Sequence, residues 1–339
     1  MKKYLVVLVI LLLVLTSLVF FACDKKITEI PEEEEWEDVI IEEAELVFEP
    51  ALPGGYLVMI DNLYQARPQS GLVQADLVYE IIAEGGITRY MAMYYSEEAP
   101  LIGPVRSARY YFVQLARGMD LPYAHAGGNV DALQLIRQNG TKDMDEIYNS
   151  EKSFWRDKSR SAPHNLYTST ELLVEGAEKR GFEPKTPELP PVDREAGGFE
   201  GKEVTGESIK ISYNTSKDNN RYIVEWKWEA DEDGVMRYCR YLNEEQQFTR
   251  EGEAIWADTI FILTAKTKSV IKEEVQSQLD IVGDGNALRF VNNQFAEGSW
   301  SKPKEVLPLV ITDKNGIEFK RKEGKLWIQV VPDLSYVEY

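Results

Sequence analysis

The sequence has few cysteines and few histidines. Its 339 residues include two of each, Cys23 and Cys239, His125 and His164. Two cysteines make no disulfide framework, so we expect the chain to fold by burying apolar side chains. A metal needs three or four ligands, and both histidines with Asp61 would be a minimal set. No HExxH pairing supports that set, and no phosphate-loop or dinucleotide pattern is present, so we expect neither metal nor cofactor.

Basic residues are also scarce. The chain has 38 basic and 57 acidic residues, a formal net charge of −19. This balance argues against nucleic acid as a partner, because binding the phosphate backbone requires clustered cations. Residues 28–141 contain no lysine but six arginines: Arg67, Arg89, Arg106, Arg109, Arg117 and Arg137. Arginine presents a planar fork of donors, so this usage indicates an anion-binding or ion-paired site.

Residues 1–22 have the features of a lipoprotein signal peptide. Two lysines precede an apolar run from Tyr4 to Phe21, and Ala22 precedes Cys23. A basic start, an apolar stretch and a small residue at the cleavage point are typical of exported proteins. Cys23 then resembles the lipid-modified cysteine of bacterial lipoproteins, although Phe20 stands where leucine is usual. The alternative is an uncleaved transmembrane anchor.

Residues 23–50 are predicted to form an acidic tether. Eleven acidic residues and no basic ones lie between Glu29 and Glu49. Like charges repel, so such a segment stays extended and spans at most about 90 Å. It either lifts the folded part off the membrane or serves as a solubilising spacer. Val39 to Phe48 is apolar enough to dock as an edge strand.

Residues 51–182 are predicted to form an α/β domain with a mixed sheet. Strands are expected over Tyr56–Ile60, Asp76–Ala83, Ile87–Tyr95 and Leu121–Ala126, with helices that start after Ser107, Asn129 and Thr168. Gly85-Gly86 predicts a tight hairpin. If Glu84 pairs with Ile87, then Glu80, Glu84 and Arg89 share one face. The two glutamates would lie about 13 Å apart, too far for a glycosidase pair.

The candidate site lies at the ends of these elements. Arg106 and Arg109 flank Ser107, the expected N-cap of a helix, and a helix start attracts anions. Glu80 and Glu84 are the internal acids that would neutralise the arginines if no ligand does. The expected anion-binding residues are Asn62, Arg67, Arg89, Arg106, Ser107 and Arg109. The candidates for acid–base catalysis are His125, Asp61, Glu80 and Glu84.

Residues 183–206, rich in proline, glycine and acids, predict a linker that proteases reach. Residues 207–339 predict an all-β sandwich or barrel, with a hairpin turn at Asn315-Gly316. Trp226, Trp228 and Tyr222 share one strand face, which is more typical of a core than of a sugar-stacking platform. Cys239 is expected to be a small buried hydrophobe.

Six motifs carry a family resemblance. In order they are VMIDN, ARPQSGL, ADLVYE, EGGITRY, IGPVRSAR and HAGG. Together they resemble the YerB-like lipoproteins of Gram-positive bacteria, which pair two domains of unknown function. The resemblance implies a lipid-anchored protein but no established reaction.

These observations favour a binding function at the outer face of the cytoplasmic membrane. The lipid on Cys23 would hold the protein there, and an anionic wall component or an envelope protein would be its partner. One alternative is a hydrolase of a wall component that uses His125 with an acid. The other is a structural scaffold in which every arginine is paired internally.

Overall fold

The computed structural model describes residues 49–194, 201–213, 222–271 and 275–339. The predictions for the signal peptide, for Cys23 and for the tether concern residues outside this part. Within it, no helix is both long enough and apolar enough to cross a membrane.

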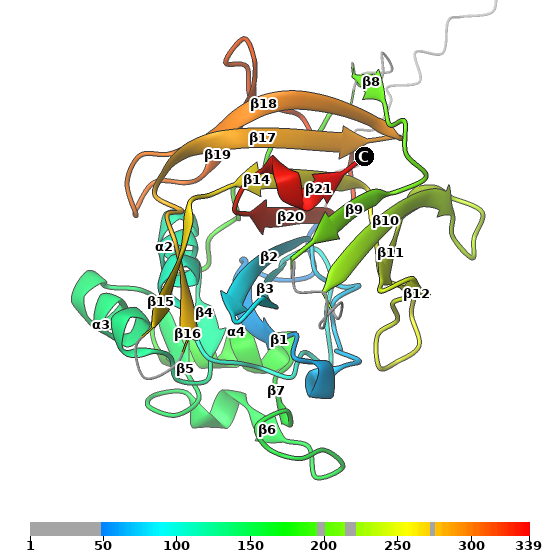
Figure 1. Ribbon diagram of the computed structural model, residues 1–339. Coiled ribbons are helices and arrows are strands. Elements are labelled where there is room, and N and C mark those ends of the chain that lie inside the picture. The colour runs from blue at the N-terminus through cyan, green and yellow to red at the C-terminus, as the bar shows by residue number, and fades with distance from the viewer. Residues whose placement is uncertain (1–48, 195–200, 214–221, 272–274) are drawn as a thin grey trace, which may run out of the picture. The chain divides into compact units, whose positions relative to one another are not determined.

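One large sheet runs through both parts of the sequence (Figure 1). Its strand order is β19-β18-β17-β14-β20-β2-β3-β1-β4-β5, and β8 pairs with β18 beside this path. The strands from the first part are β1 Tyr56–Asp61, β2 Leu77–Glu84, β3 Ile87–Tyr94, β4 Tyr123–His125 and β5 Asp143–Asp145. Those from the second part are β8 Lys202–Glu203, β14 Thr259–Thr264, β17 Gly283–Val291, β18 Gln294–Lys302, β19 Val310–Asp313 and β20 Leu326–Val331.

The first part of this sheet is mixed, as predicted. Strand β1 is antiparallel to β3 and parallel to β4, and β4 is parallel to β5. All six residues of β1 are buried, which explains why its sequence is a continuous apolar run that ends in Asp61. The fold class, an α/β part followed by a β part, is confirmed.

A second, antiparallel sheet belongs to the β part. Its order is β12-β11-β10-β9-β21, with β13 paired to β11. The strands are β9 Ile209–Ser212, β10 Ile223–Ala230, β11 Met236–Leu242, β12 Glu245–Gln246, β13 Trp256–Ala257 and β21 Val337–Glu338. Two small hairpins are separate from both sheets: β6 Trp155–Arg156 with β7 Leu166–Tyr167, and β15 Thr267–Ile271 with β16 Val275–Leu279.

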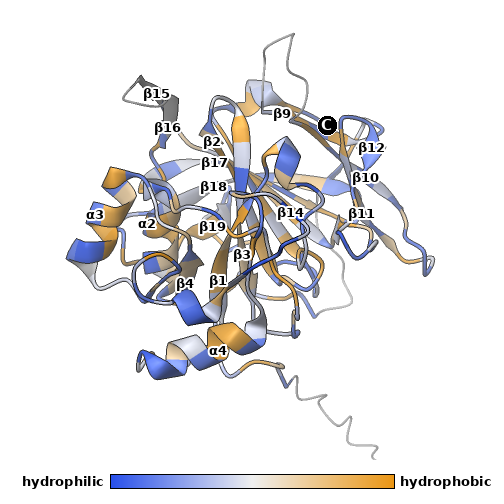
Figure 2. Cartoon of the chain, turned by 90° about the horizontal axis from the view of Figure 1, so that it is seen from below, coloured by the Kyte–Doolittle hydropathy of each residue, from blue (hydrophilic) through white to orange (hydrophobic). Residues whose placement is uncertain are grey.

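In the described part, three helices of ten residues each pack on the large sheet: α2 Tyr110–Met119, α3 Val130–Asn139 and α4 Thr170–Lys179. Short 3-10 turns cover η1 Tyr64–Ala66, η2 Glu151–Ser153 and η3 Leu334–Tyr336. The side chain of Asn129 caps α3, as expected, and Ser169 caps α4 by accepting from the Leu172 amide. Figure 2 shows hydrophobic and hydrophilic residues on each of α3 and α4, as on helices with one buried face.

The expected role of Ser107 as the N-cap of a helix is wrong. The N-cap position of α2 is Arg109, and no side chain caps it. Residues before it are held in extended form, because the Arg106 amide donates to the Met59 carbonyl and the Ala108 amide to the Gly127 carbonyl. Sheet-type bonds therefore delay the helix.

The hairpin of β2 and β3 has the predicted turn but a different register. Gly85 and Gly86 both have positive φ, and Glu84 pairs with Ile87. A bulge between Ile82 and Glu84 then places Arg89 opposite Ile81. Glu80, the residue before Ile81, therefore points to the other face of the sheet. The expectation that Glu80 shares a face with Glu84 and Arg89 is wrong.

The large sheet separates two hydrophobic cores. On one face, residues such as Val58, Tyr90 and Ile260 pack against the second sheet, including Trp226, and against α4. The other face packs on α2 and α3. Trp226 and Tyr222 are buried, which confirms the core role of their strand face, and burial raises the pKa of the Cys239 thiol to about 11.

Glu80 forms a buried ion pair with Arg240 of β11. Glu80 Oε2 lies 2.7 Å from Arg240 Nη2, and neither side chain is exposed. The guanidinium lies 4.7 Å from the ring centre of Trp327 and 5.1 Å from that of Trp226. Tyr213 donates to the Glu80 carbonyl, and burial raises the pKa of its hydroxyl well above the usual value, so it stays a donor.

The predicted linker contacts both parts of the fold. The Gly55 amide donates to the Lys185 carbonyl, and the Asp193 amide to the Arg321 carbonyl. Strand β20 also lies between β14 and β2, so the two parts share a sheet. The domain boundary at residues 183–206 stays a prediction, but we expect the parts on either side to depend on each other for stability.

We predict that Glu80→Gln and Arg240→Met each destabilise the fold by about 3–5 kcal/mol, because each leaves a buried charge without its partner. The double variant should lose less than the sum of the two, as measured by urea unfolding. Glu175→Gln, which breaks an exposed pair with Lys179, is the control and should cost below about 1 kcal/mol. Additive losses would show that the pair is not coupled.

Candidate functional site

Two of the predicted anion-binding arginines are paired internally. Arg89 Nη2 lies 3.1 Å from Glu84 Oε2, and Arg109 pairs with Glu84 Oε1. Arg89 Nη1 also donates to the Ser107 carbonyl at 2.8 Å. Burial, and then the charge of Arg89, lower the pKa of Arg109, while Glu84 opposes this shift. This cluster has the character of an internal ion pair.

His125 is likewise occupied. It is fully buried, with Nδ1 2.8 Å from the Gly127 carbonyl oxygen and Nε2 2.7 Å from Asp143 Oδ1. The carbonyl oxygen only accepts, so Nδ1 carries a proton, and Nε2 faces a carboxylate. Neither nitrogen is open to a substrate. Glu80, in its buried pair with Arg240, is equally inaccessible.

Two basic side chains, Arg106 and His164, contact Asp61 at the end of β1. Asp61 is 2 % exposed, and its Oδ1 accepts from the Leu63 amide. Its Oδ2 lies 2.8 Å from His164 Nδ1 and 3.2 Å from Arg106 Nε. One buried carboxylate thus contacts two basic side chains, of which His164 is 14 % and Arg106 28 % exposed.

Both side chains present open polar atoms. No described residue hydrogen-bonds to the Nη atoms of Arg106, and these atoms, unlike its Nε, are not buried. The outer fork of the guanidinium is therefore open to solvent. His164 Nδ1 faces a carboxylate, so that nitrogen carries the proton, and no described residue bonds to Nε2.

Asn62 and Arg67 lie beside this centre. Arg67 Nε donates to Asn62 Oδ1 at 3.0 Å, and its guanidinium carbon lies 4.7 Å from the ring centre of Tyr222. Asn62 in turn donates to Thr88 at 2.6 Å. Both residues are largely committed to positioning the turn that follows β1.

The loop that carries His164 is organised by Asp157. Its Oδ1 accepts from the amide and the hydroxyl of Ser159, both at 2.7 Å, and its Oδ2 pairs with Arg250 at 2.5 Å. Bonds from Ser159, and then from Arg250, lower the pKa of Asp157 to about 2. Arg250 comes from the β part and also donates to Ser159 Oγ at 3.1 Å. The second part of the chain therefore holds the loop of the first.

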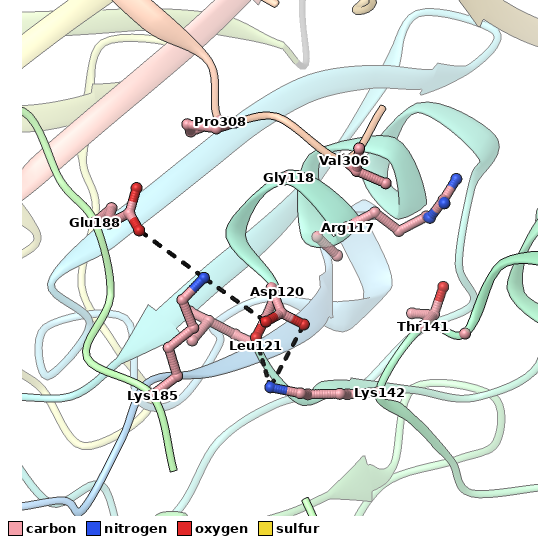
Figure 3. A pocket seen from close by; sticks show the side chains of 12 residues that line it. Arg117, Gly118, Asp120, Leu121, Thr141, Lys142, Lys185, Glu188, Val306 and Pro308 are labelled. Atoms are coloured by element: carbon pink, nitrogen blue, oxygen red, sulfur yellow. Dashed lines mark hydrogen bonds and ion pairs between the residues drawn. The ribbon is translucent and has the colours of Figure 1, made fainter. Parts of the chain in front are cut away.

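A separate cavity of about 340 Å³ lies at the end of α2. Figure 3 shows Lys142 and Lys185 directed at Asp120, with Arg117 and Thr141 farther along the wall. Lys142 Nζ donates to the Asp120 carbonyl at 3.0 Å, and Lys185 Nζ to the Met119 carbonyl at 3.2 Å. These lysines satisfy the last carbonyls of a helix and complement its negative end. No predicted site residue lines this cavity except Arg117, from the arginine-rich stretch.

Within the described ranges, no group of three or more His, Cys, Asp or Glu residues is arranged to hold a metal ion. The centre around Asp61 has one carboxylate, one imidazole and one guanidinium. It is suited to binding an anion, or to removing a proton from water or a hydroxyl at His164 Nε2.

Two linked parts share one sheet, and Arg106 and His164 contact Asp61 at the end of β1. Residues 44–183 match the family described as "Protein of unknown function (DUF3048) N-terminal domain". Residues 209–328 match the corresponding C-terminal domain. The chain belongs to this DUF3048 family, which confirms the resemblance of the six motifs.

Two comparisons identify relatives in Bacillus subtilis. The protein named "Putative lipoprotein YerB" is 30% identical over 278 residues, 82% of this chain and 81% of its own length. The crystal structure of the YerB protein matches with a TM-score of 0.73 at 28% identity, and the match covers 84% of this chain and 93% of that one. The chain is thus similar to a lipoprotein in both sequence and fold.

From the sequence, His164 was expected only as a possible metal ligand, and Arg160 and Arg250 were not predicted to be near a site. One signal was present: Arg156, Lys158 and Arg160 precede His164 within nine residues of an otherwise acidic chain. The pairing of His164 with Asp61, across 103 positions, leaves no local pattern.

We predict that Arg250→Met loosens the loop of His164, because Asp157 and Ser159 lose their partner from the β part. Hydrogen exchange should become faster in residues 157–165 than in wild type and stay unchanged in α3. Lys314→Met, which removes an exposed pair with Glu297, is the matched control. Unchanged exchange in the loop would show that Asp157 and Ser159 hold it without Arg250.

Proposed function

We propose that the protein is a lipid-anchored binding protein of the cell envelope, which holds an anionic wall component or an acidic partner segment at Arg106 and His164. The observation that supports this most is the pair of open Nη atoms on Arg106, beside an imidazole with an open Nε2. Two parallel N–H donors match the two oxygens of a carboxylate or phosphate.

Local charge favours the same ligand class. Asp61 is the acid that faces both Arg106 and His164, and Lys158 and Arg160 lie on the same loop as His164. On a chain of net charge −19, this concentration of cations attracts an anion to one place. Arg89 and Arg109 add two further positive charges to this part of the chain, and both are paired internally with Glu84.

A second candidate function rests on the Asp61–His164 pair. A buried carboxylate that fixes one ring nitrogen and leaves the other to solvent is the arrangement of a general base. No serine or cysteine among the described residues hydrogen-bonds to His164 Nε2. Such a hydrolase of the wall would activate water, with His164 in the role expected of His125.

Lipid attachment at Cys23 would place this site outside the cytoplasmic membrane. The name of the Bacillus subtilis relative, "Putative lipoprotein YerB", supports a lipoprotein, and the run Tyr4–Phe21 with Ala22 before Cys23 supports the position of the lipid. The alternative, a scaffold that contacts only proteins, is favoured if the site binds no small anion.

For the site, we predict that lactate or inorganic phosphate raises the melting temperature of the protein by mass action. Arg106→Lys keeps the charge but loses the bidentate fork, so the ligand concentration for half the shift should rise about tenfold, a loss of about 1.4 kcal/mol. Arg137→Lys, an exposed arginine on α3, is the control and should bind as wild type does.

If neither lactate nor inorganic phosphate raises the melting temperature of the wild-type protein, anion binding at Arg106 is excluded. A hydrolysis assay with a His164→Gln variant separates the two candidate functions. Purified wall material should release no soluble product if the site only binds. Product release that His164→Gln abolishes, with the anion-dependent shift retained, would establish the hydrolase instead.

For the anchor, we predict that Cys23→Ala blocks lipid attachment, because alanine has no thiol to modify. The precursor should keep residues 1–22 and remain in the membrane fraction. Mass spectrometry of the mature amino terminus checks this. An unmodified Cys23 behind an intact Tyr4–Phe21 segment in the wild-type protein would contradict the lipoprotein assignment.

A further inference from the structure

An exposed tryptophan lies on the hairpin that carries His164. Trp155 of β6 pairs with Tyr167 of β7, and the two ring centres are 6.3 Å apart with an angle of 30° between the planes. Tyr167 is fully buried, but Trp155 remains 37 % exposed. The indole therefore packs against the buried Tyr167 ring and keeps part of its own surface exposed to solvent.

Arg160, which has no acidic partner among the described residues, is hydrogen-bonded to the same Tyr167 side chain. Arg160 Nη1 donates to the Tyr167 hydroxyl at 2.7 Å, and Nη2 donates to the Arg67 carbonyl at 2.8 Å. No carboxylate of the described residues pairs with Arg160. Its neutral acceptors hold the guanidinium in place and leave its positive charge uncompensated.

A short series of contacts joins the tryptophan to the anion-binding centre. Tyr167, directly opposite Trp155, accepts a hydrogen bond from Arg160. Arg160 also donates to the Arg67 carbonyl, and Arg67 is bonded to Asn62, the residue after Asp61. These contacts connect the indole, through Arg160, to the turn that carries Asp61.

We infer that the site takes a carboxylate-bearing saccharide: one sugar ring stacks on Trp155, and the carboxylate binds Arg160 and Arg106. This inference rests on the proposed function and names its ligand class. The apolar face of a sugar ring covers an aromatic side chain that a simple anion would leave exposed. Few polar groups at fixed positions then set orientation, as in most small-molecule sites.

Three probes test the two halves of the ligand separately. The first is the acidic disaccharide of N-acetylglucosamine and N-acetylmuramic acid. The second is chitobiose, which lacks the lactyl carboxylate, and the third is lactate, which lacks the sugars. Calorimetric titration of the full-length protein in detergent should show the acidic disaccharide binding about tenfold more tightly than either other probe, a gain of about 1.4 kcal/mol.

Variants assign the gain to residues. Trp155→Ala should weaken the acidic disaccharide to the level of lactate and leave lactate unchanged, and Trp155→Phe should restore part of the loss. Arg160→Lys should weaken the acidic disaccharide and leave chitobiose unchanged. Tyr148→Ala, which removes another exposed aromatic ring, is the control and should bind all three as wild type does.

The outcomes separate this inference from the proposed function. If the acidic disaccharide binds no more tightly than lactate, or if Trp155→Ala leaves it unchanged, the saccharide assignment is overturned, while lactate binding that depends on Arg106 keeps the anion site. If neither lactate nor the acidic disaccharide binds, the anion site and this inference both fail. Tight chitobiose binding without a carboxylate effect would overturn the role of Arg160.

Discussion

The buried ion pair of Glu80 and Arg240 sets the geometry on which the site depends. Two charges removed from water are tolerated when each faces the other. Here Arg240 Nε also donates to Gln247 Oε1 at 2.7 Å, while its buried Nη1 has no hydrogen-bond partner among the described residues. Glu80 Oε1 accepts from Thr88, Thr88 is bonded to Asn62, and the Asn62 carbonyl accepts from Tyr222 of the β part. Asp61 is the residue before Asn62. A contact between the two parts therefore determines where the carboxylate of the site lies.

The arginines near the site divide into two kinds with different physical roles. Arg89 and Arg109 share Glu84 and are shielded from solvent, so their charges stabilise the junction of β3 and α2. Arg106 meets Asp61 through its Nε atom, and its outer fork is open. Proximity along the chain, within IGPVRSAR, does not separate these roles. The direction of each side chain does, and sheet-type bonds around Arg106 and Ala108 set that direction.

Local signals predicted local structure well. The apolar runs gave β1, β2 and β3, Gly85-Gly86 gave the turn, and Asn129 gave the start of α3. The bulge near Ala83 was not predictable, because Ala83 has no turn signal and the extra residue is set by pairing. Strand β18 follows a turn that was not predicted from the sequence, in which Asn292 and Asn293 both have positive φ. Arg240 and His164 meet partners far away in sequence, so no periodicity indicates either contact.

The position of β20 has a kinetic consequence. Leu326 pairs with Leu77 on one side and with Thr259 on the other, so the large sheet stays divided until almost the whole chain is available. Until then, the edge of β2 exposes unpaired backbone groups to other chains. Contacts so distant in sequence make folding slow, because loop closure precedes the gain from pairing. Any compartment that receives this chain from its amino terminus must therefore keep the first part from aggregating until the last strand arrives.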